Sequence, residues 1–149
     1  MSARGASTQG AGGSASPPLF AAWALALVSS LAVLFIGEVL GQAPCNLCWF
    51  QRAFMFPLAV ILGLAFLAGD AGVWRYGAPL AGLGAAVAAW HTLLYVGLVP
   101  AAVQPCAASG PSCTGEGMAI LGLPIPALAL LSFGTILALL LQLRRRSVA

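Results

Sequence analysis

Four long apolar runs constrain the fold of this chain more than any other feature. They cover residues 19–40, 49–68, 78–99 and 125–143, and each is about 20 residues long. A helix of that length and composition crosses the hydrocarbon core of a bilayer. Since the backbone must satisfy its own hydrogen bonds inside hydrocarbon, each run is predicted to be a helix. The sequence therefore predicts an all-α integral membrane protein, folded as a bundle of four transmembrane helices.

The composition supports lipid as the solvent for most of the chain. Hydrophobic residues make up 61% of the 149 residues, and charged residues only 6%. Soluble domains carry about 25% charged residues. The net charge of +3 comes from scattered arginines, which is too little to indicate a nucleic-acid partner. The composition therefore predicts contact with membrane lipid and no nucleic-acid partner.

The first 16 residues differ from the rest because they are small and polar and have no apolar periodicity. We expect residues 1–16 to form a disordered tail. The apolar run that follows is longer than the segment of about 7–15 residues found in a cleaved signal peptide. The chain is thus predicted to consist of this tail and one membrane domain at 17–146.

The arginines predict the orientation of the bundle. Given four spans, five of the six arginines fall on one side of the membrane and Arg52 falls on the other. The five are Arg4, Arg75 and the run at 144–146. Positive charge favours the cytoplasmic side. Both termini are then predicted to be cytoplasmic, with loops 41–48 and 100–124 on the outer side.

All four cysteines lie in these two outer loops. They are Cys45, Cys48, Cys106 and Cys113. Disulfides persist in oxidising compartments, such as the outer side of a bacterial inner membrane. Cysteines that serve only as small hydrophobic residues would be expected to scatter into the apolar spans. The distribution indicates sulfur chemistry on the outer face.

The first pair lies in PCNLCWFQR, at the entrance to the second span. The positive end of the helix dipole favours thiolate at Cys45 and Cys48. The spacing is typical of a redox pair, a metal site or a structural bridge. Arg52 follows Cys48 by four residues and lies on the same helical face, about 6 Å deeper. Its role is either an interfacial anchor or the stabilisation of negative charge, on a thiolate or on a lipid-soluble electron acceptor.

The second pair, Cys106 and Cys113, lies in QPCAASGPSCTGEG. Gly110 and Pro111 between them indicate a turn, so a Cys106–Cys113 disulfide can close a short ring. Such a bond is either a structural staple or an exposed disulfide that exchanges with the thiols of a partner.

His91 is the only histidine and lies in the third span, about two helical turns from its outer end. An ionisable group at that depth is a candidate functional residue. The alternative is a neutral histidine that forms hydrogen bonds between helices.

Net formation of disulfides requires a two-electron acceptor, since exchange only moves oxidation from one pair to another. The sequence has no GxGxxG fingerprint, no CxxCH haem site and no iron–sulfur cysteine run. A membrane quinone requires no such motif, because it diffuses in the bilayer and can reach a CxxC at the boundary between helix and interface.

Together these residues resemble the DsbB family of quinone-dependent thiol oxidases, and within it the BdbC-like branch. The resemblance covers roughly residues 19–143. It rests on PCNLCWFQR, on HTLLY in the third span, on ASGPSC in the outer loop and on LGLPIP before the last span. It implies a multi-pass protein of the bacterial inner membrane that links oxidative protein folding to electron transport.

The resemblance also implies a catalytic role for all four cysteines. A reduced thioredoxin-like partner, of the DsbA or BdbD kind, would attack the Cys106–Cys113 disulfide at Cys106. Cys113 would then pair transiently with Cys45. Cys48 would pass the electrons to the quinone, and the Cys45–Cys48 disulfide would be the second redox-active centre.

For the cofactor, ubiquinone or menaquinone, the resemblance implies two binding residues. Arg52 matches the arginine on the quinone side of the family's site, and His91 matches a histidine near it. One feature departs from the DsbB members with a long outer loop: Cys106 and Cys113 are closer in sequence here. The shorter loop fits a BdbC-like partnership better.

Two rival functions use the same residues. The first is a membrane protein that binds zinc or copper through its cysteines and histidine. The second is a non-catalytic assembly factor whose bundle is stapled by disulfides.

Overall fold

The computed structural model describes residues 16–99, 113, 119–120 and 122–148. In this part of the chain, four helices are long and apolar enough to cross a membrane. They are α1 (Pro17–Leu34), α2 (Asn46–Ala68), α3 (Trp74–Tyr95) and α4 (Ile125–Val148). The predicted all-α bundle of four membrane helices is confirmed. Most of the predicted tail and most of the loop at 100–124 lie outside the described residues.

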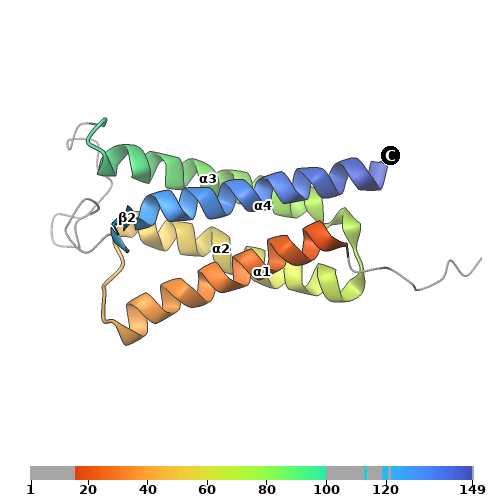
Figure 1. Cartoon of the computed structure of the whole chain (residues 1–149), viewed down its shortest axis with the longest axis horizontal. Helices are drawn as coiled ribbons and strands as arrows, with labels where there is room; N and C mark the ends of the chain where they lie inside the picture. Colours follow the sequence, from red (N-terminus) through yellow and green to blue (C-terminus); the bar gives the residue numbers. More distant parts are fainter. Residues whose placement is uncertain (1–15, 100–112, 114–118, 121, 149) are drawn as a thin grey trace, which may run out of the picture.

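The helices form a ring in which each packs against two neighbours, in the order α1, α2, α3, α4. The start of α1 and the end of α4 lie at the same end of the bundle (Figure 1). The start of α2 lies at the opposite end, beside the start of α4. This arrangement separates the start of α1 and the end of α4 from the segment that carries the first cysteine pair.

The connections between helices are short where the structure describes them. Between α2 and α3, Gly69 adopts a left-handed conformation with φ 66°, which glycine tolerates without steric cost. Asp70 then accepts a hydrogen bond of 2.7 Å from the Gly72 N–H. A 3₁₀ turn at Ala71–Val73 leads into α3. These local contacts reverse the chain within a few residues.

Three structural details were not part of the predicted spans. α1 continues as a π-helical segment, Phe35–Val39. Two short antiparallel strands, β1 (Ala119–Ile120) and β2 (Leu123–Pro124), precede α4. Finally, α4 extends past its apolar run through the three arginines, because positive charge is favourable at a helix C-terminus.

A buried stripe of small residues on α3 organises the interior. Its members recur every three or four residues, which places them on one helical face. They are Gly77, Ala81, Gly84 and Ala88, followed on the same face by His91. Small residues let neighbouring helices approach closely, and α3 makes its most extensive contacts with α4. His91 therefore points into the bundle because it continues a packing stripe.

Gly84 is the tightest position of this stripe. A Cβ atom at Gly84 would clash with the ring of Phe133 on α4, and Phe133 is itself fully buried. We expect Gly84→Ala to lower the free energy of unfolding by about 1–3 kcal/mol, the usual cost of overpacking a core. Thermal unfolding in detergent measures the effect.

Gly82→Ala is the matched control, because nothing lies within 4 Å of a Cβ at Gly82. It should unfold at the temperature of the unmodified chain or slightly above it, because alanine is favoured over glycine within a helix. Equal melting temperatures for Gly84→Ala and Gly82→Ala would contradict the described packing of α3 on α4.

Candidate active site

Cys45 caps the N-terminus of α2. Its backbone is extended, with φ −70° and ψ 167°, and its Sγ atom accepts a hydrogen bond of 3.3 Å from the Cys48 N–H. The cap and the third helical residue are the two positions that face each other at a helix start. The Cys-x-x-Cys spacing therefore brings the sulfurs together, 2.8 Å apart. Both are thiols in this structure, and a disulfide of about 2.05 Å requires only a small movement.

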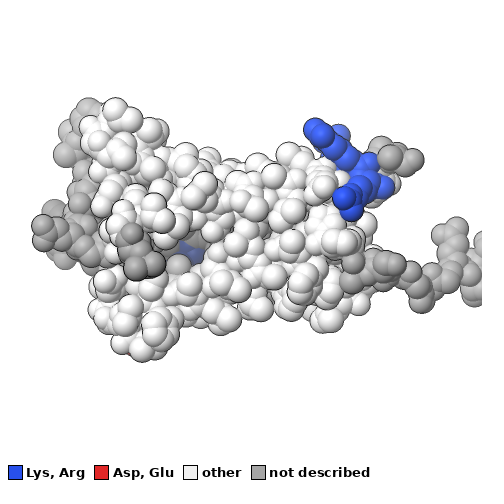
Figure 2. Space-filling view, in the orientation of Figure 1, with Lys and Arg blue, Asp and Glu red and all other residues white. Residues whose placement is uncertain are grey.

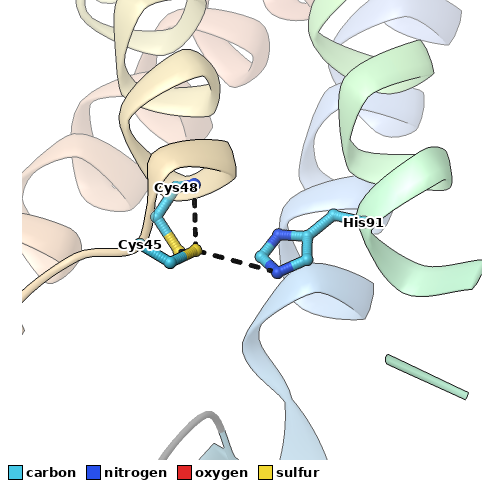
Figure 3. A group of neighbouring side chains, drawn as sticks. All are labelled: Cys45, Cys48 and His91. Carbon is cyan, nitrogen blue, oxygen red and sulfur yellow. Dashed lines mark hydrogen bonds between the residues drawn. The ribbon is translucent and has the colours of Figure 1, made fainter. Parts of the chain in front are cut away.

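His91 approaches this pair from α3, with its ring directed at the sulfurs (Figure 3). Its side chain is fully buried. The Nε2 atom lies 3.9 Å from the Cys45 Sγ and 3.1 Å from the backbone oxygen of Cys113. The Nδ1 atom lies 3.1 Å from the side-chain nitrogen of Gln51. His91 thus joins the first cysteine pair to the outer loop and to the second turn of α2.

Cys113 packs beside the first pair although it is distant in sequence. It is buried in one apolar cluster with Cys45, Leu47 and Leu94. Cys113 is disulfide-bonded, and Cys106 lies outside the described residues. The structure thus places a cysteine of the second loop in the same buried cluster as the cysteine that caps α2.

The surroundings of Cys45 favour its ionised form. The hydrogen bond with the Cys48 thiol lowers the pKa of the Cys45 thiol most strongly. Burial acts in the opposite direction, and the hydrogen bond with His91 lowers the pKa again, so the net shift is downward. The thiolate is the nucleophilic form of cysteine, and a thiol of low pKa is also a good leaving group. Cys45 is therefore suited to disulfide exchange.

On the other side of α2, a cavity of about 350 Å³ lies among α1, α2 and α4. Its lining is mostly apolar and includes Cys48, Gln51 and Arg52 of α2. Ser29 and Ser132 add two hydroxyl groups from α1 and α4, 3.4 Å apart. Cys48 thus contacts the Cys45 sulfur and also lines an apolar space within the bundle.

Arg52 places a positive charge in this cavity. It is only 9% exposed, and its Nη2 donates a hydrogen bond of 2.9 Å to the Val33 oxygen. Its guanidinium lies 5.4 Å from the centre of the Trp49 ring. Gly37, in the π-helical segment, leaves room for it, since a Cβ there would lie 3.2 Å from Nη2. The carbonyl and the ring are neutral, so these contacts orient the positive charge without cancelling it.

The structure places the predicted site residues in two groups. Cys45, His91 and Cys113 gather on one side of Cys48, whereas Arg52 lies with the cavity on the other. His91 was expected on the cofactor side, but it is not among the residues that line the cavity.

Sequence reasoning missed Gln51, which contacts His91 and also lines the cavity. A signal was available, because Gln51 is a polar residue within an apolar span, three residues after Cys48 and on its helical face.

The two cysteines of the first pair and His91 together offer three ligand atoms to a metal ion. The Sγ atoms of Cys45 and Cys48 and a ring nitrogen of His91 lie within 4.8 Å of one another. Two thiolates and an imidazole suit zinc or copper(I). However, the His91 Nε2 faces the Cys113 oxygen at 3.1 Å, so metal binding through Nε2 would displace that hydrogen bond.

Comparison with known proteins agrees with the site. The family model "Disulfide bond formation protein DsbB" matches residues 16–143. The chain is 59% identical over 130 residues to a probable disulfide formation protein of Metapseudomonas resinovorans, covering 87% of this chain and 90% of that relative. It is 39% identical over 116 residues to disulfide bond formation protein C of Bacillus subtilis, covering 77% and 83%.

A probable disulfide formation protein of Deinococcus radiodurans is 39% identical over 137 residues, which cover 86% of this chain and 89% of the relative. No solved structure matches the chain significantly. The resemblance to disulfide formation proteins, including the protein C branch, is confirmed. The chain belongs to the DsbB family of membrane disulfide bond formation proteins.

Proposed function

We propose that this chain is a thiol:quinone oxidoreductase, which re-oxidises a thioredoxin-like protein and passes the electrons to a membrane quinone. One observation carries the proposal: the first cysteine pair touches two different environments. Cys45 shares a buried cluster with Cys113, and the His91 Nε2 contacts both residues, whereas Cys48 lines the apolar cavity that holds Arg52. A pair placed in this way can receive electrons from a loop disulfide and deliver them to an acceptor dissolved in the bilayer.

The cavity fits a quinone head group. Small-molecule sites typically occupy about 300–1,000 Å³ and have an apolar lining with a few polar groups, and this cavity of about 350 Å³ has that character. When bound, a quinone supplies an acceptor for two electrons and two protons. Arg52 would stabilise negative charge on one of its oxygens. Ser29 and Ser132 supply hydroxyl groups for its polar edge.

The exchange steps use the four cysteines in order. A thiolate of the reduced partner attacks Cys106, forms a mixed disulfide and releases Cys113 as a thiolate. That thiolate attacks Cys45, and the Cys45–Cys48 bond breaks as the Cys113–Cys45 bond forms. Cys48 is released as a thiolate at the cavity wall. Each exchange forms one sulfur–sulfur bond and breaks one, so the electron pair moves from the partner toward the cavity.

The cysteine end of the bundle is proposed to face the outside of a bacterial inner membrane. Most of the basic surface in view gathers at the end of the bundle where α4 ends, and one small recessed basic patch lies in the other half (Figure 2). At the end where α4 ends, the Arg144 guanidinium lies 5.0 Å from the centre of the Trp74 ring. Positive charge favours the cytoplasmic side, and the start of α2 lies at the other end (Figure 1).

Thiol labelling of intact cells tests this orientation. After reduction, an impermeant maleimide should label Cys106 of the unmodified chain from outside. It should not label a Ser147→Cys variant in which the four native cysteines are replaced by serine, because position 147 then carries the only thiol. Labelling of Ser147→Cys from outside would show that the orientation is reversed.

A coupled assay tests the proposed reaction. Reduced thioredoxin-like partner and a short-chain quinone should yield oxidised partner and quinol in equal amounts. Cys45→Ser and Cys48→Ser should each abolish turnover, because either change removes one sulfur of the relay. Normal turnover in either variant would remove this pair from the mechanism.

The same assay measures the role of Arg52. Arg52→Met should lower kcat/KM for quinone about tenfold to hundredfold, the range expected for loss of a hydrogen bond to a charged group. The KM for the protein partner should not change. Arg75→Met is the control, because Arg75 belongs to the first turn of α3, at the opposite end of the bundle. If Arg52→Met and Arg75→Met behave alike, the cavity is not the quinone site.

Metal binding is the second candidate, because three ligand atoms lie within 4.8 Å of one another. Metal analysis of the purified reduced protein decides between the two. One zinc or copper per chain that is lost in Cys45→Ser, together with no quinol formation, would replace the proposed function with metal binding.

A further inference from the structure

The contacts of His91 determine which ring nitrogen carries its proton. The backbone oxygen of Cys113, 3.1 Å from Nε2, can only accept a hydrogen bond, so Nε2 must be the protonated nitrogen. A neutral imidazole carries one ring proton, which leaves Nδ1 as an acceptor. The group that meets Nδ1 is the side-chain nitrogen of Gln51, at 3.1 Å, which can only donate. The two contacts therefore select the same tautomer.

The selected tautomer also matches the Cys45 sulfur. The protonated Nε2 lies 3.9 Å from the Cys45 Sγ, so its N–H can donate a hydrogen bond to the sulfur when the sulfur carries negative charge. In the other tautomer, the Nε2 lone pair would face the lone pairs of the Cys113 oxygen, and it would also face those of the sulfur whenever Cys45 is a thiolate. His91 is fully buried and Gln51 is 7% exposed, so water has little access to replace either contact.

We propose that Gln51 is a positioning residue, which holds His91 in the Nε2–H tautomer and thereby makes it a hydrogen-bond donor to the Cys45 sulfur and to the backbone of Cys113. In this role His91 is not a base. The assignment of the tautomer depends only on the contacts of His91, whereas its effect on disulfide exchange rests on the proposed function. That effect is faster exchange between Cys113 and Cys45, because the donor stabilises Cys45 as a thiolate and holds the two residues together.

The placement of Gln51 suits this role. It follows Cys48 by three residues on α2 and thus shares its helical face, while His91 is fixed by the packing stripe of α3. One helix therefore presents the thiol pair together with the amide that orients the imidazole. The amide is neutral, so it selects a tautomer without favouring the doubly protonated ring. A carboxylate at the same position would accept a hydrogen bond from a protonated Nδ1 and would thereby favour the charged imidazolium.

Nitrogen NMR tests the tautomer directly, because His91 is the only histidine in the chain. The full chain, labelled with ¹⁵N-histidine and reduced, is reconstituted in phosphatidylethanolamine–phosphatidylglycerol bilayers. We expect a protonated, pyrrole-like Nε2 and an unprotonated, pyridine-like Nδ1. A protonated Nδ1 in this protein would overturn the proposal, and this measurement requires no variant.

Two variants test the part played by Gln51. Gln51→Glu, which is nearly isosteric, should add a proton at Nδ1 and shift that resonance to the pyrrole-like range. Gln142→Glu is the control, because Gln142 is exposed on α4, and its spectrum should match that of the unmodified chain. A Gln51→Glu spectrum identical to that of Gln142→Glu would overturn the proposal.

Single-turnover disulfide exchange in the absence of quinone measures the effect of Gln51 on the exchange between Cys113 and Cys45. Reduced partner is mixed with oxidised protein, and the reduction of the Cys45–Cys48 disulfide is followed. Gln51→Leu should slow this step about tenfold, as expected for one lost hydrogen bond. In a His91→Phe background the same change should have no further effect, whereas a purely structural role for Gln51 would persist there and would overturn the proposal. Because quinone is absent, failure of the quinone reaction does not affect this result.

Discussion

The hydrogen bond that caps α2 is the contact on which the rest of the site depends. Because the Cys45 sulfur accepts the Cys48 N–H, the helix starts at Asn46, and both sulfurs lie at its positive end. The next turn then presents Gln51 to His91 and Arg52 to the cavity. A helix that started one residue later would rotate these side chains by about 100° relative to the cap, and the sulfur pair would lose its two distinct surroundings.

The neighbouring helices complete the site at the start of α2, because they supply a histidine on one side and a cavity on the other. The small-residue stripe of α3 brings His91 into the interior at the level of the sulfurs. On the opposite side, α1 and α4 leave an apolar cavity, into which Arg52 brings a charge oriented by the Val33 carbonyl. The site therefore combines a polar sulfur cluster with an apolar space, and Cys48 and Gln51 lie between them. That arrangement suits transfer of electrons from protein thiols to a small apolar acceptor.

Part of this account could be predicted from the sequence because it depends on local periodicity. Hydrocarbon forces the apolar runs into helices, and the spacing of Cys48 and Arg52 places them on one face before any partner is known. Contacts between helices depend on packing register, which a single sequence does not contain. The approach of Cys113 to Cys45 entered only through a family resemblance, and the contact between Gln51 and His91 was not predicted. His91 was assigned to the cofactor side on that resemblance, whereas its contacts here are with sulfur and amide groups.

The central claim is that Cys113 lies within reach of Cys45 at the start of α2, and disulfide trapping tests it most directly. In a Cys48→Ser, Cys106→Ser double variant, Cys45 and Cys113 are the only cysteines left in the chain. Mild oxidation in lipid followed by non-reducing peptide mapping should give an intramolecular Cys45–Cys113 disulfide in most molecules. Recovery of both residues as thiols, or as disulfides between separate chains, would contradict the account.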